Sequence, residues 1–206
     1  MQSAEALATA LGMLSCPHMT RRVRLSPLPK GISFLLEVAA GENEALHSAS
    51  ARTGRTEATL RKAAGFFIEQ VLLSEHANNY RVLGCSCEAS QRELRRHMAL
   101  IMRWLHPDVV CNGAQTQRFD RGLYADRVVA AWEAVKTKER REAYDASLAA
   151  RTRMGAERGS KRLLIPHLRN EPAAISRKRF KKQRALTPSK GASFWSRVIL
   201  LFAGRP

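Results

Sequence analysis

The tripeptide His106-Pro107-Asp108 stands between two amphipathic segments, and this position constrains the fold more than any other feature of the chain. Proline cannot continue a helix and disfavours helical backbone in its predecessor, so the tripeptide predicts a break between two helices. Apolar residues recur at helical spacing on both sides of the break. The first stripe is Leu94, Met98, Ile101, Met102 and Leu105, and the second is Tyr124, Val128, Ala131, Trp132 and Val135. We therefore expect two antiparallel helices, with the turn exposed at one end.

The first of these helices also carries a cationic face. Ser90 and Glu93 have the spacing of a capping box, which predicts that the helix begins here. At about 100° per residue, several arginines then lie away from the apolar stripe. This basic ridge consists of Arg92, Arg95, Arg96 and Arg103. We expect it to attract an acidic partner surface, next to the short polar groups of the turn.

Four ordered blocks give this region a family resemblance. They are Asn-Tyr-Arg-Val-Leu-Gly at 79–84, Ala-Ser-Gln-Arg-Glu-Leu at 89–94 with Leu-His-Pro-Asp at 105–108, Ala-Trp-Glu-Ala-Val at 131–135, and Arg-Glu-Ala-Tyr-Asp at 141–145. Together they resemble the J-domain (DnaJ-like) co-chaperones over residues 78–147. The chain departs from that family at Trp104 and Val109, where basic residues are common. It also has no Gly/Phe-rich linker or zinc-ribbon cysteine repeat after this region.

The resemblance implies a function in the binding of another protein. A J-domain co-chaperone docks on a DnaK-type heat-shock chaperone through His106, Pro107, Asp108 and the basic ridge, and stimulates the ATPase of that partner. It thereby assists the folding of unfolded client proteins. The alternative is a J-like adaptor that keeps the fold but does not stimulate the ATPase of a partner. Such an adaptor would localise at an anionic membrane surface or on nucleic acid through its basic tail.

The rest of the chain is expected to be all-α with a flexible tail. Residues 1–30 end in a Pro-rich stretch and are expected to form a disordered extension. Residues 31–75 predict a small helical bundle, whose clearest stripe is Leu60, Ala64, Phe67, Ile68 and Val71. We interpret the bundle as a scaffold that extends the core rather than as a docking module for a client or partner. The helical pattern weakens after residue 150.

Residues 151–206 hold most of the net positive charge, with 15 Lys and Arg against 2 Asp and Glu in a chain of net charge +17. Their densest basic run includes Arg177, Lys178, Arg179, Lys181 and Lys182, and an apolar patch with Phe194 and Trp195 follows. Three interpretations stay open: an anchor on an anionic membrane surface, a nucleic-acid contact, or a terminal helix that folds onto the bundle. Nucleic acid ranks last, because the aromatic residues are not interleaved with the charges. We expect a cytoplasmic protein, attached to the inner face of a membrane under the first interpretation.

The sequence gives no reason to expect an enzyme. His106 and Asp108 are separated by proline, and no nucleophile or Gly-rich phosphate loop accompanies them. Cys85 and Cys87 lack the C-x-x-C spacing of zinc sites, although a zinc site that joins them to a distant Cys or His is conceivable. We expect neither a metal nor a cofactor, and interpret both cysteines as half-buried residues in a loop.

Overall fold

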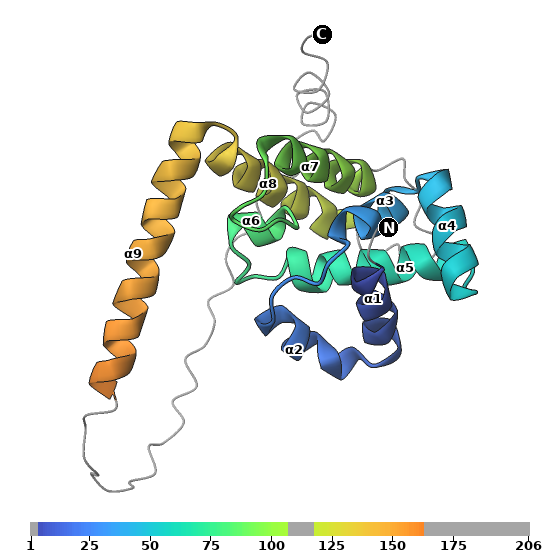
Figure 1. Ribbon diagram of the computed structural model, residues 1–206, viewed down its shortest axis with the longest axis horizontal. Helices are drawn as coiled ribbons and strands as arrows, with labels where there is room; N and C mark the ends of the chain where they lie inside the picture. Colours follow the sequence, from blue (N-terminus) through green and yellow to red (C-terminus); the bar gives the residue numbers. More distant parts are fainter. Residues whose placement is uncertain (1–3, 107–117, 163–206) are drawn as a thin grey trace, which may run out of the picture. The chain divides into compact units, whose positions relative to one another are not determined.

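The computed structural model describes residues 4–106 and 118–162, and every regular element in these ranges is a helix (Figure 1). The expected all-α class is therefore confirmed for this part of the chain. No helix among these residues is both long enough and apolar enough to cross a membrane.

The first helices contradict the expected disorder of residues 1–30. Helix α1 spans Glu5–Ser15, the 3-10 turn η1 spans Pro17–Met19, and α2 spans Thr20–Leu25. Helix α1 buries Ala6, Leu7, Ala10 and Met13 and packs against α3 and α5. The prediction failed because the apolar face of α1 is narrow and relies on small alanines, whose burial depends on contacts with distant parts of the chain.

The expected bundle follows, with its helices close to their predicted positions. Helix α3 spans Ile32–Ala40, α4 spans Asn43–Thr53, and α5 spans Glu57–Phe67 and continues into the π-helical turn η2, Ile68–Leu72. Helix α5 packs against α1, α3 and α4, so it forms the centre of the bundle. All five residues of its predicted stripe are fully buried.

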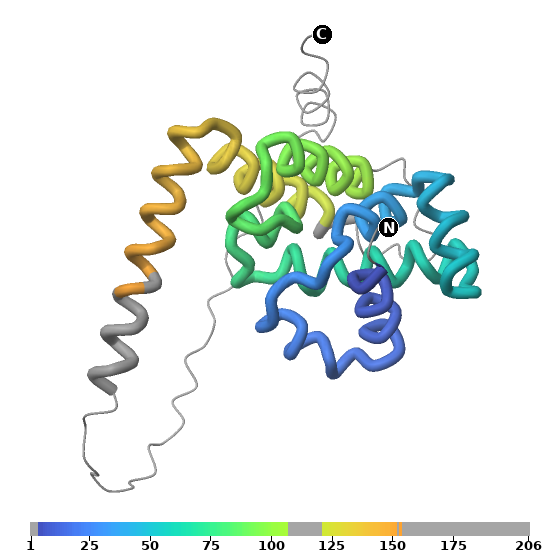
Figure 2. The backbone as a smooth tube through the Cα atoms, in the orientation of Figure 1, coloured from blue at the N-terminus to red at the C-terminus, as the bar shows by residue number. Residues whose placement is uncertain are grey.

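The remaining helices are α6 (Asn79–Val82), α7 (Gln91–Leu105), α8 (Arg118–Val135) and α9 (Lys138–Arg162). Helices α7 and α8 run in opposite directions, as Figure 2 shows. The Gln91 side chain donates to the carbonyl oxygen of Lys136, and the Arg121 guanidinium donates to that of His106. These bonds join opposite ends of the two helices, so the expected antiparallel pair is confirmed.

Helix α9 corrects the expected start of the tail. We expected flexible chain from residue 151, because glycines follow at 155 and 159, yet the helix continues to Arg162. A glycine in a helix interior costs only about 1 kcal/mol relative to alanine, which does not have to end a long helix.

Candidate functional site

Helix α7 is the element on which the predicted partner site depends. The Ser90 hydroxyl accepts a hydrogen bond from the Glu93 amide at 3.2 Å, so the helix begins at the predicted cap. All five residues of its predicted apolar stripe are buried, and the helix packs against α8. The phase derived from the sequence is therefore correct for this face.

Helix α7 also buries a second face, which sequence analysis missed. His97, Leu100 and Trp104 are at most 7 % exposed, and the helix packs against α3 of the bundle. A Cβ atom at Gly65 of α5 would lie 3.4 Å from the Trp104 ring, so the ring packs directly on α5. The tryptophan that departs from the J-domain pattern is thus a contact between α7 and the bundle. The spacing of these three residues, at i, i+3 and i+7, was the available signal.

The bundle contacts half of the basic ridge. Arg96 pairs with Glu37 of α3 at 2.6 Å, and Arg103 lies 3.7 Å from Glu42, the N-cap residue of α4. Arg92 and Arg95 are exposed and form no ion pair with any residue that the structure describes. The ridge is therefore divided into two arginines held by the bundle and two that face solvent.

Glu37 is a charged group in a buried position. Its side chain is 7 % exposed, whereas that of Arg96 is 59 % exposed. Burial raises the pKa of the Glu37 carboxyl, and the neighbouring Arg96 guanidinium opposes this shift. The ion pair therefore offsets only part of the cost of placing a carboxylate between α3 and α7.

The predicted turn begins where α7 ends. His106 is half-buried, and its amide donates to the carbonyl oxygen of Arg103 at 3.2 Å. Pro107 and Asp108 lie outside the described residues. So do the tail residues Arg177, Lys178, Arg179, Lys181, Lys182, Phe194 and Trp195.

The first and last blocks of the J-domain resemblance lie together, although more than 50 residues separate them in the sequence. The Tyr80 hydroxyl donates to Asp145 at 2.7 Å and accepts from Arg141 at 3.1 Å. The Tyr144 hydroxyl accepts from the Asn79 amide at 3.0 Å, and the two tyrosine rings pack edge to face. Burial and the hydrogen bond to Asp145 raise the pKa of Tyr80 to about 12, so the phenol stays protonated as a donor.

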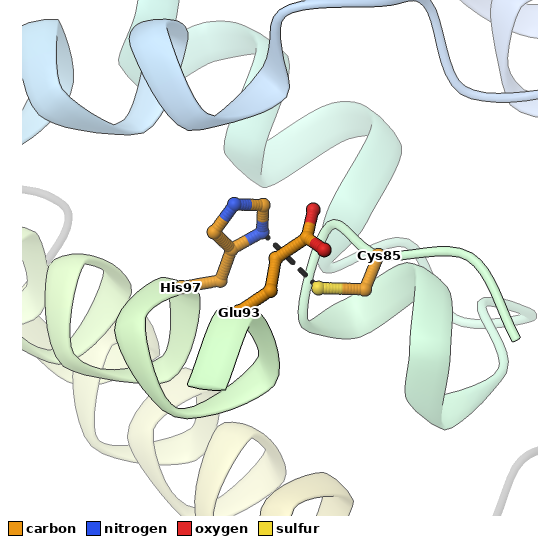
Figure 3. Close-up of side chains that lie close together, drawn as sticks. All are labelled: Cys85, Glu93 and His97. Atoms are coloured by element: carbon orange, nitrogen blue, oxygen red, sulfur yellow. Dashed lines mark hydrogen bonds between the residues drawn. The ribbon is translucent and has the colours of Figure 1, made fainter. Parts of the chain in front are cut away.

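A buried polar cluster lies between the bundle and α7 (Figure 3). The His97 Nδ1 atom lies 3.1 Å from the carbonyl oxygen of Leu83 and 3.2 Å from the Cys85 thiol, and Nε2 lies 2.7 Å from the Ser33 hydroxyl. Burial lowers the pKa of His97, so the ring is neutral, with Nδ1 donating to Leu83 and Nε2 accepting from Ser33. Sequence analysis did not select His97. The available signal for its burial, a position within a run of residues that are mostly buried, was weak.

The two cysteines of the loop after α6 differ in their surroundings. Cys85 is buried, and burial raises the pKa of its thiol to about 12, while Cys87 is exposed. The expectation that both are half-buried is therefore wrong. The preceding Gly84 has a φ of +66°, and a Cβ atom there would lie 2.8 Å from Ile32 of α3, so this loop packs tightly on the bundle.

Comparison with known proteins identifies no relative: no family model, curated protein or solved structure matches this chain.

Proposed function

We propose that this protein is a J-domain co-chaperone that binds a DnaK-type heat-shock chaperone and stimulates its ATPase. The observation that supports this most is the contact between the Tyr80 block and the Arg141–Tyr144–Asp145 block. Only the family resemblance relates these segments in the sequence, and specific hydrogen bonds join them in the fold. A chance resemblance of short motifs would not require such contacts.

The exposed surface agrees with a docking function. Arg92 and Arg95 present positive charge to solvent on one side of α7, and His106 lies at the end of the same helix. Surface charges of this kind increase the association rate with an acidic partner and orient it, and salt weakens both effects. In this proposal the chemistry occurs in the partner, because docking shifts the conformational equilibrium that controls ATP hydrolysis there.

The division of the ridge favours a second candidate, a J-like adaptor that binds the chaperone without stimulating its ATPase. Arg96 and Arg103 face acidic residues of the bundle, so a partner that requires all four arginines has to displace those contacts. The adaptor would use the basic tail at an anionic membrane surface. In this candidate the fold is the same, but the ATPase rate of the partner does not change.

One experiment separates the two candidates. Binding of the full-length protein to a DnaK-type chaperone is measured by calorimetry, and hydrolysis of pre-bound ATP is followed in a single turnover. The co-chaperone predicts binding together with faster hydrolysis, whereas the adaptor predicts binding at an unchanged rate. Absence of binding at low salt would contradict both.

The membrane binding proposed for the adaptor is tested with vesicles. If the tail is an anchor, the full-length protein sediments with vesicles that contain anionic lipid and is released as salt rises, because each basic residue near the surface contributes about 1 kcal/mol. A chain that ends after Arg162 retains the described helices and is expected to stay in the supernatant. Equal sedimentation of both proteins would contradict the anchor.

A further inference from the structure

Three different metal-ligating side chains meet where the buried cluster between the bundle and α7 reaches the surface: Cys85 and His97 are buried, and Glu93 is exposed. The Cys85 thiol, the Glu93 carboxylate and His97 Nδ1 all lie within 4.8 Å of one another. Glu93 and His97 are four residues apart on α7, so both project from the same face of the helix. Cys85 reaches the cluster from the loop after α6 (Figure 3).

We propose that Cys85, Glu93 and His97 form a zinc-binding site. Zinc accepts thiolate, imidazole and carboxylate ligands together, and three protein ligands leave a fourth position for water. Magnesium and calcium prefer oxygen ligands alone, so the mixture of sulfur, nitrogen and oxygen favours zinc over these ions. This site is separate from the proposed chaperone contact and does not depend on it.

The distances require only small movements. A tetrahedral zinc ion separates its sulfur and nitrogen ligands by about 3.5 Å, given bonds of about 2.3 and 2.0 Å. Cys85 Sγ and His97 Nδ1 lie 3.2 Å apart, so they have to separate by a few tenths of an ångström. Glu93 lies within 4.8 Å of both other ligands, and its exposed position allows its carboxylate to turn toward the ion.

Ser33 provides the outer support that a ligating histidine requires. Its hydroxyl lies 2.7 Å from His97 Nε2, the ring nitrogen that does not face the cluster. When Nδ1 binds zinc, the imidazole proton moves to Nε2 and donates to Ser33, which fixes the ring orientation. The thiol proton of Cys85 leaves to solvent as the zinc–sulfur bond forms. Leu83 then loses two donors, the His97 ring and the Cys85 thiol, so the metal–ligand bonds have to outweigh these contacts.

The cluster is accessible to an ion from solvent. A surface groove of about 640 Å³ is lined by all three ligands, by Ser33, and by the exposed Cys87. Bound zinc would join the α6–α7 loop to helix α7, at the place where Ser33 and Gly84 connect this loop and helix to the bundle. We therefore infer that a bound ion stabilises the junction of the bundle with the following helices, although the position left to water distinguishes this site from a closed four-ligand structural site.

The test uses full-length protein that is freed of metal with a chelator and reduced with a phosphine. Cobalt(II) is added as a spectroscopic probe, and a thiolate-to-cobalt charge-transfer band is expected at one equivalent, with its loss on addition of zinc. Glu93→Gln is expected to weaken cobalt binding more than about tenfold, and Ser33→Ala by about tenfold. Saturating zinc should raise the melting temperature by roughly 5 °C.

Matched variants test whether the charge-transfer band comes from this cluster. Cys85→Ala should abolish the band, whereas Cys87→Ser, in the same loop but exposed, should retain it. Glu88→Gln removes an equal charge from an exposed position nearby and should bind cobalt like the wild type. The proposal is overturned if no charge-transfer band forms, or if Cys87→Ser abolishes the band. Equal affinities of Glu93→Gln and Glu88→Gln would overturn it as well.

Discussion

Removing Arg96 is expected to cost far more stability than removing its partner Glu37. The two side chains form one ion pair at 2.6 Å, but Glu37 is 7 % exposed and Arg96 is 59 % exposed. In Arg96→Met the carboxylate stays buried without its cation. In Glu37→Gln the remaining guanidinium turns into water. The asymmetry follows from burial, although the same bond is lost in both variants.

The size of each loss in stability follows from the same exposed fractions of Glu37 and Arg96. Leaving a fully buried charge without its partner costs about 3–5 kcal/mol, and water on the Arg96 side reduces this value. We expect a loss of about 2 kcal/mol in the free energy of unfolding for Arg96→Met at pH 7. For Glu37→Gln we expect a loss below about 1 kcal/mol, since the amide still hydrogen-bonds and the arginine is solvated. Arg92→Met is the matched control, because Arg92 is exposed on the same helix.

The cost of Arg96→Met should also depend on pH. Burial raises the folded-state pKa of Glu37 above its ordinary value of 4.5, and Arg96 lowers it. Without Arg96 the folded-state pKa rises further, so the folded protein binds a proton more readily than the unfolded chain. The penalty is then present at pH 7 and shrinks as the pH falls toward about 5.

Urea unfolding, followed by circular dichroism at both pH values, measures these differences. The reasoning is refuted if Arg96→Met is no less stable than Arg92→Met. It is also refuted if Glu37→Gln costs as much as Arg96→Met, or if the cost of Arg96→Met grows on acidification.

Other predictions concern backbone conformation and the contact between the motif blocks. Gly84→Ala should lower the free energy of unfolding by about 2–4 kcal/mol, because its φ of +66° strains any other residue and its Cβ would lie 2.8 Å from Ile32. Gly122→Ala is the control: among the described residues, no atom beyond its chain neighbours and its own helix backbone lies within 4 Å of its added Cβ, and we expect a gain of up to about 1 kcal/mol in the free energy of unfolding in urea. Tyr144→Phe removes the acceptor of the Asn79 amide at 3.0 Å, and should lower the melting temperature by an amount equivalent to about 1 kcal/mol.

The sequence predicted those elements whose signal is local. The stripe on α7 has its cap and its apolar residues within a single segment, so the phase and the start of the helix could be derived together. The same holds for the stripe on α5. In both helices the apolar residues recur with the helical period and therefore lie on one face. That face packs against neighbouring elements, as it does in most helices of globular proteins.

The failures concern contacts between distant segments. Helix α1 buries two alanines beside Leu7 and Met13, a pattern too weak to recognise without the surface of α5 that covers it. Trp104 and His97 are buried because the bundle covers a second side of α7, and no local pattern identifies the element that covers them. The metal-ligand cluster depends on the same packing, since Cys85 approaches His97 only after the loop folds back onto α7.

The central claim is that His106 acts on a chaperone partner, and one measurement tests it most directly. Single-turnover ATP hydrolysis by a DnaK-type chaperone is followed with the wild type, with His106→Gln and with His76→Gln. His76 is the control, because it is exposed and lies outside the four motif blocks. The account predicts stimulation by the wild type and by His76→Gln, and the basal rate with His106→Gln at an unchanged melting temperature. Equal stimulation by all three proteins would contradict it.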